Sequence, residues 1–156
     1  MDKPEFVYVT YIAATSEAVW NALVDGEMTK DYWVRHRNAS DWRIGSRWEH
    51  QDYDDPAVVD IVGEVVESEP PRRLVVTWAS PADAHDVTKR SRVTYEIEPS
   101  MGTARLTVIH EGLEPGSGML RGVTEGWPIV LSSLKTLLET GQSLPMTRHR
   151  WTKPPE

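Results

Sequence analysis

The chain of 156 residues is long enough for one domain that buries about two thirds of its unfolded surface. Acidic side chains outnumber basic ones by 24 to 17, and the net charge of −7 disfavours binding to the phosphates of nucleic acids. The absence of cysteine excludes disulfides and thiolate metal ligands and fits a reducing compartment, so we expect a cytoplasmic protein.

The N-terminal part predicts one strand followed by two short helices. Residues 6–12 are rich in β-branched and aromatic side chains, as strands are, and no apolar signal segment precedes them. A first helix should begin after a cap at Thr15 or Ser16 and end at Gly26, and a second should occupy about residues 27–33. Two small helices at this place can cover the open mouth of a curved sheet.

Residues 42–111 are typical of consecutive strands joined by short turns. A hairpin is expected over residues 42–51 with its turn at Ile44 and Gly45, which puts Trp48 and His50 on one face. Short links between successive strands favour an antiparallel meander. The remaining strands are expected at residues 58–66, 72–79, 89–98 and 103–111.

Period-two alternation predicts which side chains of these strands face the inside of the sheet. Trp78, Tyr95 and His110 are inward by this rule. His110 is the leading polar candidate, because a neutral imidazole can orient a ligand or transfer a proton, and the alternative is a histidine held by hydrogen bonds in the core. His50 has the same two alternatives, and the Tyr95 hydroxyl can bind either a ligand or a carbonyl group.

A long C-terminal helix is expected from about Ser117, with Gly141 as its cap. Its apolar side chains recur at helical spacing and form a stripe wide enough to lie against a sheet. Pro128 falls inside this stripe and predicts a kink. Residues 146–156 are basic and without pattern, so we expect a single domain at residues 1–145 and a tail that is flexible or makes a subunit contact.

The motifs of common enzyme and metal sites are missing from the sequence. There is no Gly-x-Ser-x-Gly nucleophile elbow and no phosphate-binding glycine loop. The five histidines are scattered, and the aspartates of residues 52–56 lack the glycine and distal glutamate of a calcium loop. We predict no catalytic residue, no metal and no cofactor. No run approaches the ~18 apolar residues of a membrane span, so no membrane insertion is expected.

Four segments in order resemble a known family. They read Val-Trp-Asn-Ala-Leu-Val-Asp at residues 19–25, Gly-Ser-Arg-Trp at 45–48, Arg-Leu-Val-Val-Thr-Trp at 73–78, and a Gly-Trp pair followed by spaced leucines at 126–139. The family is named after the activator of the 90-kDa heat-shock-protein ATPase and belongs to the START-like, or polyketide cyclase and lipid-transfer, superfamily (SRPBCC). The resemblance covers about residues 6–141.

The resemblance implies an α+β helix-grip fold. In this fold a curved antiparallel sheet of six or seven strands wraps around a long C-terminal helix, two short helices follow the first strand, and a cavity lies between sheet and helix. The family includes co-chaperone domains and proteins that sequester small molecules. Because fold does not define activity, the site residues have to carry any functional argument.

The leading functional hypothesis is a binding module rather than an enzyme. Seven tryptophans against a single phenylalanine suit the wall of a cavity that holds a small, largely apolar ligand, aromatic or lipid-like. One alternative is a cyclase or hydrolase that uses His110 and Tyr95 in the same cavity. Another is a chaperone helper that binds a protein partner, and a homodimer also stays open. The expected ligand-binding residues are Trp33, Trp48, His50, Trp78, Tyr95, His110 and Trp127.

Overall fold

The computed structural model describes residues 3–151 and has a seven-stranded sheet, three α-helices and three short 3-10 helices. The α-helices are α1 (Ser16–Val24), α2 (Gly26–Tyr32) and α3 (Gly118–Thr140), and the 3-10 turns are η1 (Pro81–Asp83), η2 (Val87–Lys89) and η3 (Pro145–Thr147). The strands are β1 (Glu5–Ile12), β2 (His36–Ala39), β3 (Arg47–Asp52), β4 (Val59–Glu69), β5 (Arg73–Trp78), β6 (Ser91–Ser100) and β7 (Thr103–Glu111).

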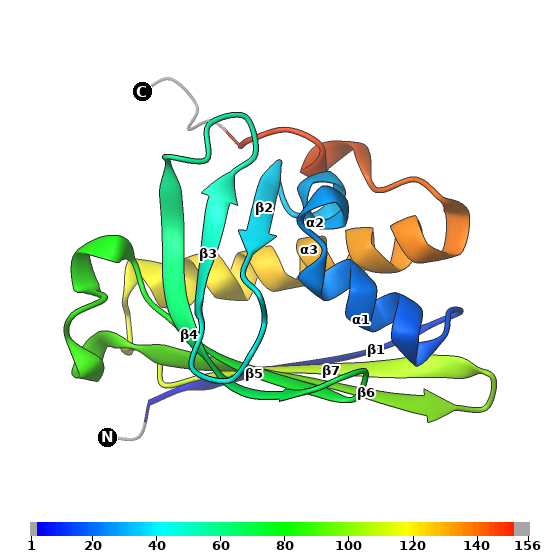
Figure 1. Ribbon diagram of the computed structural model, residues 1–156, viewed down its shortest axis with the longest axis horizontal. Helices are drawn as coiled ribbons and strands as arrows, with labels where there is room; N and C mark the ends of the chain where they lie inside the picture. Colours follow the sequence, from blue (N-terminus) through cyan, green and yellow to red (C-terminus); the bar gives the residue numbers. More distant parts are fainter. Residues whose placement is uncertain (1–2, 152–156) are drawn as a thin grey trace.

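The sheet is antiparallel throughout and grips the long helix. Its strand order is β1-β7-β6-β5-β4-β3-β2, so β1 and β2 are the two edges. Figure 1 shows β1, β7, β6 and β5 running along α3, whereas β4, β3 and β2 curve up across it. This arrangement, with α1 and α2 directly after β1, confirms the expected α+β helix-grip fold.

The sheet changes direction along β4, where one glycine is required. A Cβ atom on Gly63 would lie 1.8 Å from the backbone oxygen of Thr77, so no other residue fits without moving the backbone. The same oxygen accepts a hydrogen bond from Nε1 of Trp48 at 2.8 Å. The pairing of β4 with β5 also shifts register between Val65 and Glu67. Such irregularities bend a strand, and here they let one sheet face two sides of α3.

The expected hairpin at residues 42–51 is wrong in its first strand. The strand that precedes β3 and pairs with it is β2, at His36–Ala39. Trp42 lies in the loop that connects β2 to β3 and has a φ of 60°. Sequence reasoning missed β2 because its alternate buried side chains are His36 and Asn38, which are polar. Trp42 is fixed instead by its Nε1 atom, which donates to the Val24 carbonyl at 3.0 Å.

The helix ends follow the expected capping residues, with one exception. Thr15 caps α1, Ser117 caps α3, and Gly141 ends α3 in the left-handed conformation at a φ of 86°. Gly26 begins α2 rather than ending α1. The helix α3 continues through Pro128. None of the described helices combines the length and hydropathy that crossing a membrane requires.

The segment after α3 folds back against the domain. The side chain of Thr147 is fully buried, and its hydroxyl donates to the Asp31 carbonyl at 2.9 Å. Residues 146–151 therefore contact the domain, and the polar contacts that hold them join them to segments far away in the chain, at Asp31 and Asp52. The rest of the expected tail lies outside the described residues, and the domain boundary at residue 145 stays a prediction.

Candidate functional site

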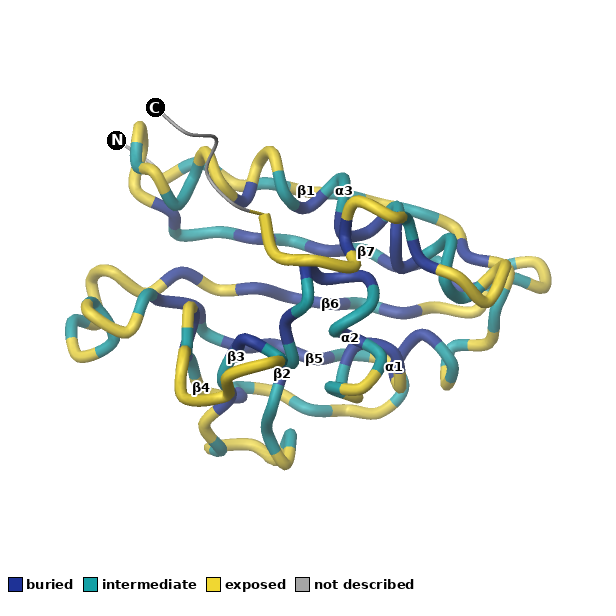
Figure 2. Tube along the Cα trace, turned by 90° about the horizontal axis from the view of Figure 1, so that it is seen from above, coloured by how far each residue is buried: buried dark blue, intermediate teal, exposed yellow. Residues whose placement is uncertain are grey.

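A cavity of about 370 Å³ lies between the N-terminal half of α3 and the strands β2, β3, β4 and β5. We call it the α3 cavity. The C-terminal end of α2 supplies Trp33 to its wall, and the last described residues, Arg150 and Trp151, border it as well. Figure 2 shows the last described part of the chain, next to the grey trace, passing alongside α3. Segments from both ends of the chain thus meet at one site.

Three of the expected tryptophans form the apolar wall of the α3 cavity. Trp33, Trp78 and Trp127 all border it and are each at least nine-tenths buried. Their ring centroids are 5.2 Å apart for Trp33 and Trp127, 5.9 Å for Trp78 and Trp127, and 6.3 Å for Trp33 and Trp78. Rings at these distances stabilise one another in tilted or offset arrangements, so the wall is held together by its own contacts.

Glycines recur on the α3 side of the cavity, among apolar side chains of the same helix that also border it. Gly118, Gly122 and Gly126 are spaced by one helical turn and all border the α3 cavity. A Cβ atom built on any of them would meet no heavy atom within 4 Å. Close packing therefore does not require glycine at these positions. Inside a helix, glycine costs about 0.5–1 kcal/mol relative to alanine, so the open space is kept at the expense of stability.

One end of the α3 cavity holds a network of polar and charged side chains. His36 lies between two acceptors, with Nε2 2.6 Å from Oδ2 of Asp60 and Nδ1 2.8 Å from the Val34 carbonyl. Arg150 contacts the same Asp60 oxygen at 3.5 Å and also pairs with Asp52. The guanidinium of Arg150 thus contacts two carboxylates, one of which also binds His36.

His50 borders the α3 cavity beside this charged end and is 6 % exposed. Its Nδ1 atom lies 2.5 Å from Oδ1 of Asn38. Its ring stacks on His36 with centroids 4.3 Å apart and planes 6° apart, and Trp33 packs on it at 5.2 Å. Burial, and then the neighbouring His36, lower the pKa of His50 well below its ordinary value. His50 is therefore a fixed, neutral imidazole.

His110 does not border the α3 cavity but lies behind the tryptophan wall. Nε1 of Trp127 donates to its Nδ1 at 3.1 Å, and its Nε2 is 2.8 Å from Oγ of Ser91. The Ser91 hydroxyl then donates to the Trp78 carbonyl at 3.2 Å. With Nδ1 as acceptor, Nε2 must carry the proton, so both nitrogens are satisfied. Burial lowers the pKa of His110 to about 3, which keeps it neutral.

Tyr95 and Trp48 are also buried without bordering the α3 cavity. Tyr95 is 4 % exposed and packs edge-on against Trp127 at 6.1 Å, and burial raises the pKa of its hydroxyl far above the ordinary value. Trp48 is 1 % exposed and uses its indole nitrogen to hold β5. Of the seven expected site residues, the structure brings Trp33, His50, Trp78 and Trp127 to the cavity.

Sequence reasoning missed His36, Asp60, Arg150 and the three glycines of α3. The glycines had a detectable signal, because three of them recur at a spacing of four residues in a segment expected to be helical. No motif in the sequence marked Asp60, and His36 had no recognised strand around it. Arg150 was placed in a patternless tail, and its ionic partner Asp52 is 98 residues away in the chain.

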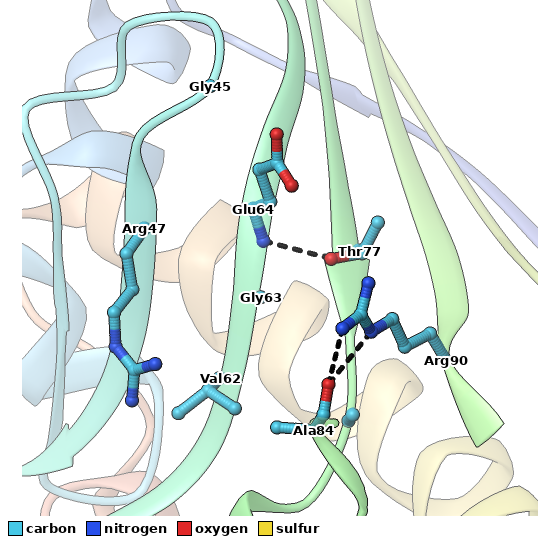
Figure 3. Close-up of a pocket in the computed structure, with 9 residues that line it drawn as sticks. Gly45, Arg47, Val62, Gly63, Glu64, Thr77, Ala84 and Arg90 are labelled. Carbon is cyan, nitrogen blue, oxygen red and sulfur yellow. Dashed lines mark hydrogen bonds between the residues drawn. The ribbon is translucent and has the colours of Figure 1, made fainter. Parts of the chain in front are cut away.

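A second hollow lies between β3, β4 and β5 and is shown in Figure 3, where α3 is behind the strands. Its volume is about 280 Å³, and Arg47, Glu64 and Arg90 border it. Arg90 donates to the Ala84 carbonyl at 2.6 and 2.9 Å, and Thr77 holds the Glu64 amide at 2.9 Å. These polar groups are already engaged, and no expected site residue borders this hollow, so the α3 cavity is the better candidate.

Metal binding finds no support in the arrangement of the described residues. Across residues 3–151, no three His, Asp or Glu side chains are grouped so that they could hold one ion. At the polar end of the α3 cavity, Asp60 is already engaged by His36 and Arg150.

Comparison with known proteins gives one family and a set of similar folds. The family model described as "Activator of Hsp90 ATPase homolog 1-like protein" matches residues 13–139. A comparison with curated protein sequences finds no match. Solved structures that resemble the chain include CalU16 from Micromonospora echinospora, with a TM-score of 0.70 and 20% identity over 89% of this chain and 78% of that one.

Two further structures carry activator names. The Aha1 dimer from Colwellia psychrerythraea has a TM-score of 0.72 and 16% identity over 90% of this chain and 99% of that one. An HSP90 activator from Plasmodium falciparum has a TM-score of 0.70 and 19% identity over 86% and 95%. At these identities the likeness shows a common fold.

Proposed function

The chain belongs to the family of activator of Hsp90 ATPase homolog 1-like proteins, and we propose that this member binds a small, largely apolar ligand in the α3 cavity. The observation that carries the proposal is a tryptophan wall together with three α3 positions in the same lining that have no side chain. Three glycines keep volume open where alanine would fit and would stabilise the helix. The free energy of binding a ligand in the cavity would offset this loss of helix stability.

The expected gain is sufficient for useful affinity. An apolar ligand that loses about 200 Å² of apolar surface gains roughly 5 kcal/mol at about 25 cal/mol per Å². The tryptophans are fixed by contacts with one another and by the hydrogen bond from Trp127 to His110, so little rearrangement opposes binding.

The positions of the acid–base candidates favour binding over catalysis. His110 and Tyr95 lie behind the tryptophan wall, and both nitrogens of His110 already have hydrogen-bond partners. A general acid or base must come within hydrogen-bond reach of the reacting atom. Neither residue borders the cavity, so the cyclase or hydrolase alternative that relies on these two groups loses its support.

Native mass spectrometry of the protein purified from its own host tests the proposal, and calorimetric titration with naphthalene tests it independently. Gly122→Leu should fill the α3 cavity and weaken naphthalene binding by about tenfold or more, which is ~1.4 kcal/mol. The control is Thr124→Leu, on the same helix but exposed and outside the lining. A clean apo mass together with no measurable heat of binding would rule the proposal out.

A second candidate function is self-association or partner binding through β1. Val7, Val9 and Tyr11 lie on one face of this edge strand and are 52, 49 and 51 % exposed. Apolar side chains on a free sheet edge are suited to pairing with another chain. Light scattering of the wild type and of Val9→Lys would measure it, and a concentration-independent monomer in both proteins would exclude self-association.

A further inference from the structure

One polar atom of the α3 cavity remains without a protein partner. His50 makes a single side-chain hydrogen bond, from Nδ1 to Asn38. Within residues 3–151, its Nε2 atom has no partner and does not belong to the polar atoms closed off from solvent. Because His50 is 94 % buried and what remains open borders the cavity, Nε2 is reached from the α3 cavity.

The chemistry of this atom follows from its neighbours. Oδ1 of Asn38 accepts, so Nδ1 carries the proton of the neutral ring and Nε2 presents a lone pair. The stacked His36 ring and the tilted Trp33 ring hold the imidazole in place from two sides. A ligand must therefore bring a hydrogen-bond donor to a fixed position.

The charges around His50 favour an uncharged donor. Asp60 faces any anion brought to this end, and Arg150 faces any cation. These groups already pair with one another, so an added charge would have to separate them. A neutral hydroxyl group donates without disturbing them.

The shape of the rest of the cavity favours an aromatic ring next to that hydroxyl. Trp33 and Trp78 are offset with their planes 26° apart, and Gly122 and Gly126 leave bare backbone in the same lining. A flat ring can approach a helix backbone that has no side chains more closely than a branched alkyl chain can.

Building on the proposed function, we infer that the α3 cavity takes an uncharged aromatic molecule that carries a hydroxyl group, of the phenol class. Its O–H group donates to Nε2 of His50, and its ring lies between the tryptophan wall and the glycines of α3. His50 is then the residue that distinguishes a phenol from the corresponding hydrocarbon.

A matched set of naphthalenes tests this inference in the unmodified protein. Naphthol should bind about threefold to tenfold more tightly than naphthalene, as expected for one hydrogen bond. Methoxynaphthalene, which keeps the oxygen but cannot donate, should bind no better than naphthalene. Acetylnaphthalene, which only accepts, should gain nothing either.

A pair of histidine variants assigns the difference to His50. His50→Phe should reduce the advantage of naphthol over naphthalene to less than about twofold, because the lone pair is gone. His85→Phe is the control, since His85 is exposed and outside the α3 cavity. Equal binding of naphthol and naphthalene to the wild type, or a preference for acetylnaphthalene, would overturn the phenol assignment and leave the proposed function standing. No binding of any of the four compounds would overturn both.

Discussion

Replacing Gly122 and Gly126 by alanine should make the protein more stable and a weaker binder at the same time. Both residues lie inside α3, and a Cβ atom on either meets nothing within 4 Å. Alanine is better than glycine in a helix interior by about 0.5–1 kcal/mol, so the double variant should gain about 1–2 kcal/mol. For a chain of this size that is a rise in Tm of roughly 2–8 °C.

The loss of affinity has a separate cause. Both new methyl groups would extend into the α3 cavity, because both residues border it. A ring bound against the helix would have to move away or force the wall apart, and overpacking of this kind costs about 1 kcal/mol or more. Naphthol should therefore bind at least about fivefold more weakly to the double variant.

Scanning calorimetry and titration calorimetry on the same samples measure the two effects. Thr124→Ala is the control, because it raises helix propensity on an exposed part of α3 that does not border the cavity. It should gain stability without losing affinity. A double variant that is less stable than the wild type, or that binds naphthol equally well, would refute the view that these glycines keep a ligand space open.

Three other outcomes follow from the structure. Burial lowers the pKa of His110 to about 3 in the folded protein, so below pH 6.5, the ordinary pKa of histidine, the unfolded chain binds one more proton than the folded one. The free energy of unfolding should therefore fall with decreasing pH, by up to about 1.4 kcal/mol per pH unit. A free energy of unfolding that stays constant in urea titrations between neutral pH and about pH 4 would contradict this. Gly63→Ala should lose about 3 kcal/mol or more, because its Cβ atom would collide with the backbone at Thr77; unchanged urea denaturation would show that the strand relaxes. Arg150→Ala should lose about 1 kcal/mol, since the mostly buried Asp52 carboxylate would keep its backbone hydrogen bonds but lose its cation; a Tm equal to that of the wild type would show that this ion pair adds nothing.

The alternation of side chains along the strands correctly predicted which of them face inward, but not which of these border the cavity. Tyr95 and His110 face inward, as expected, and both are buried. Whether an inward side chain borders the cavity depends on what lies between it and α3, and here the ring of Trp127 lies there. That separation is a property of packing between distant segments and leaves no local pattern in the sequence.

The parts of the site that sequence reasoning missed depend on partners far along the chain. His36 belongs to a polar edge strand whose pairing with β3 is not visible in its own composition. Arg150 lies in a segment without pattern, and its role becomes visible only when the fold brings Asp52, 98 residues away in the chain, next to it. Amphipathic periodicity, by contrast, is local, and it located α3 and the inward face of the sheet.

The hydrogen-bond chain from Trp127 through His110 and Ser91 to the Trp78 carbonyl joins α3, β7, β6 and β5. A change at Trp127, His110 or Ser91 removes a bond on which the next one depends, so these three positions should tolerate little variation among proteins with this fold. Gly122 and Gly126 take no part in it and border the same cavity from the other side. Ligand preference can thus change through substitutions at these two glycines of α3, while the hydrogen-bond chain stays the same from protein to protein.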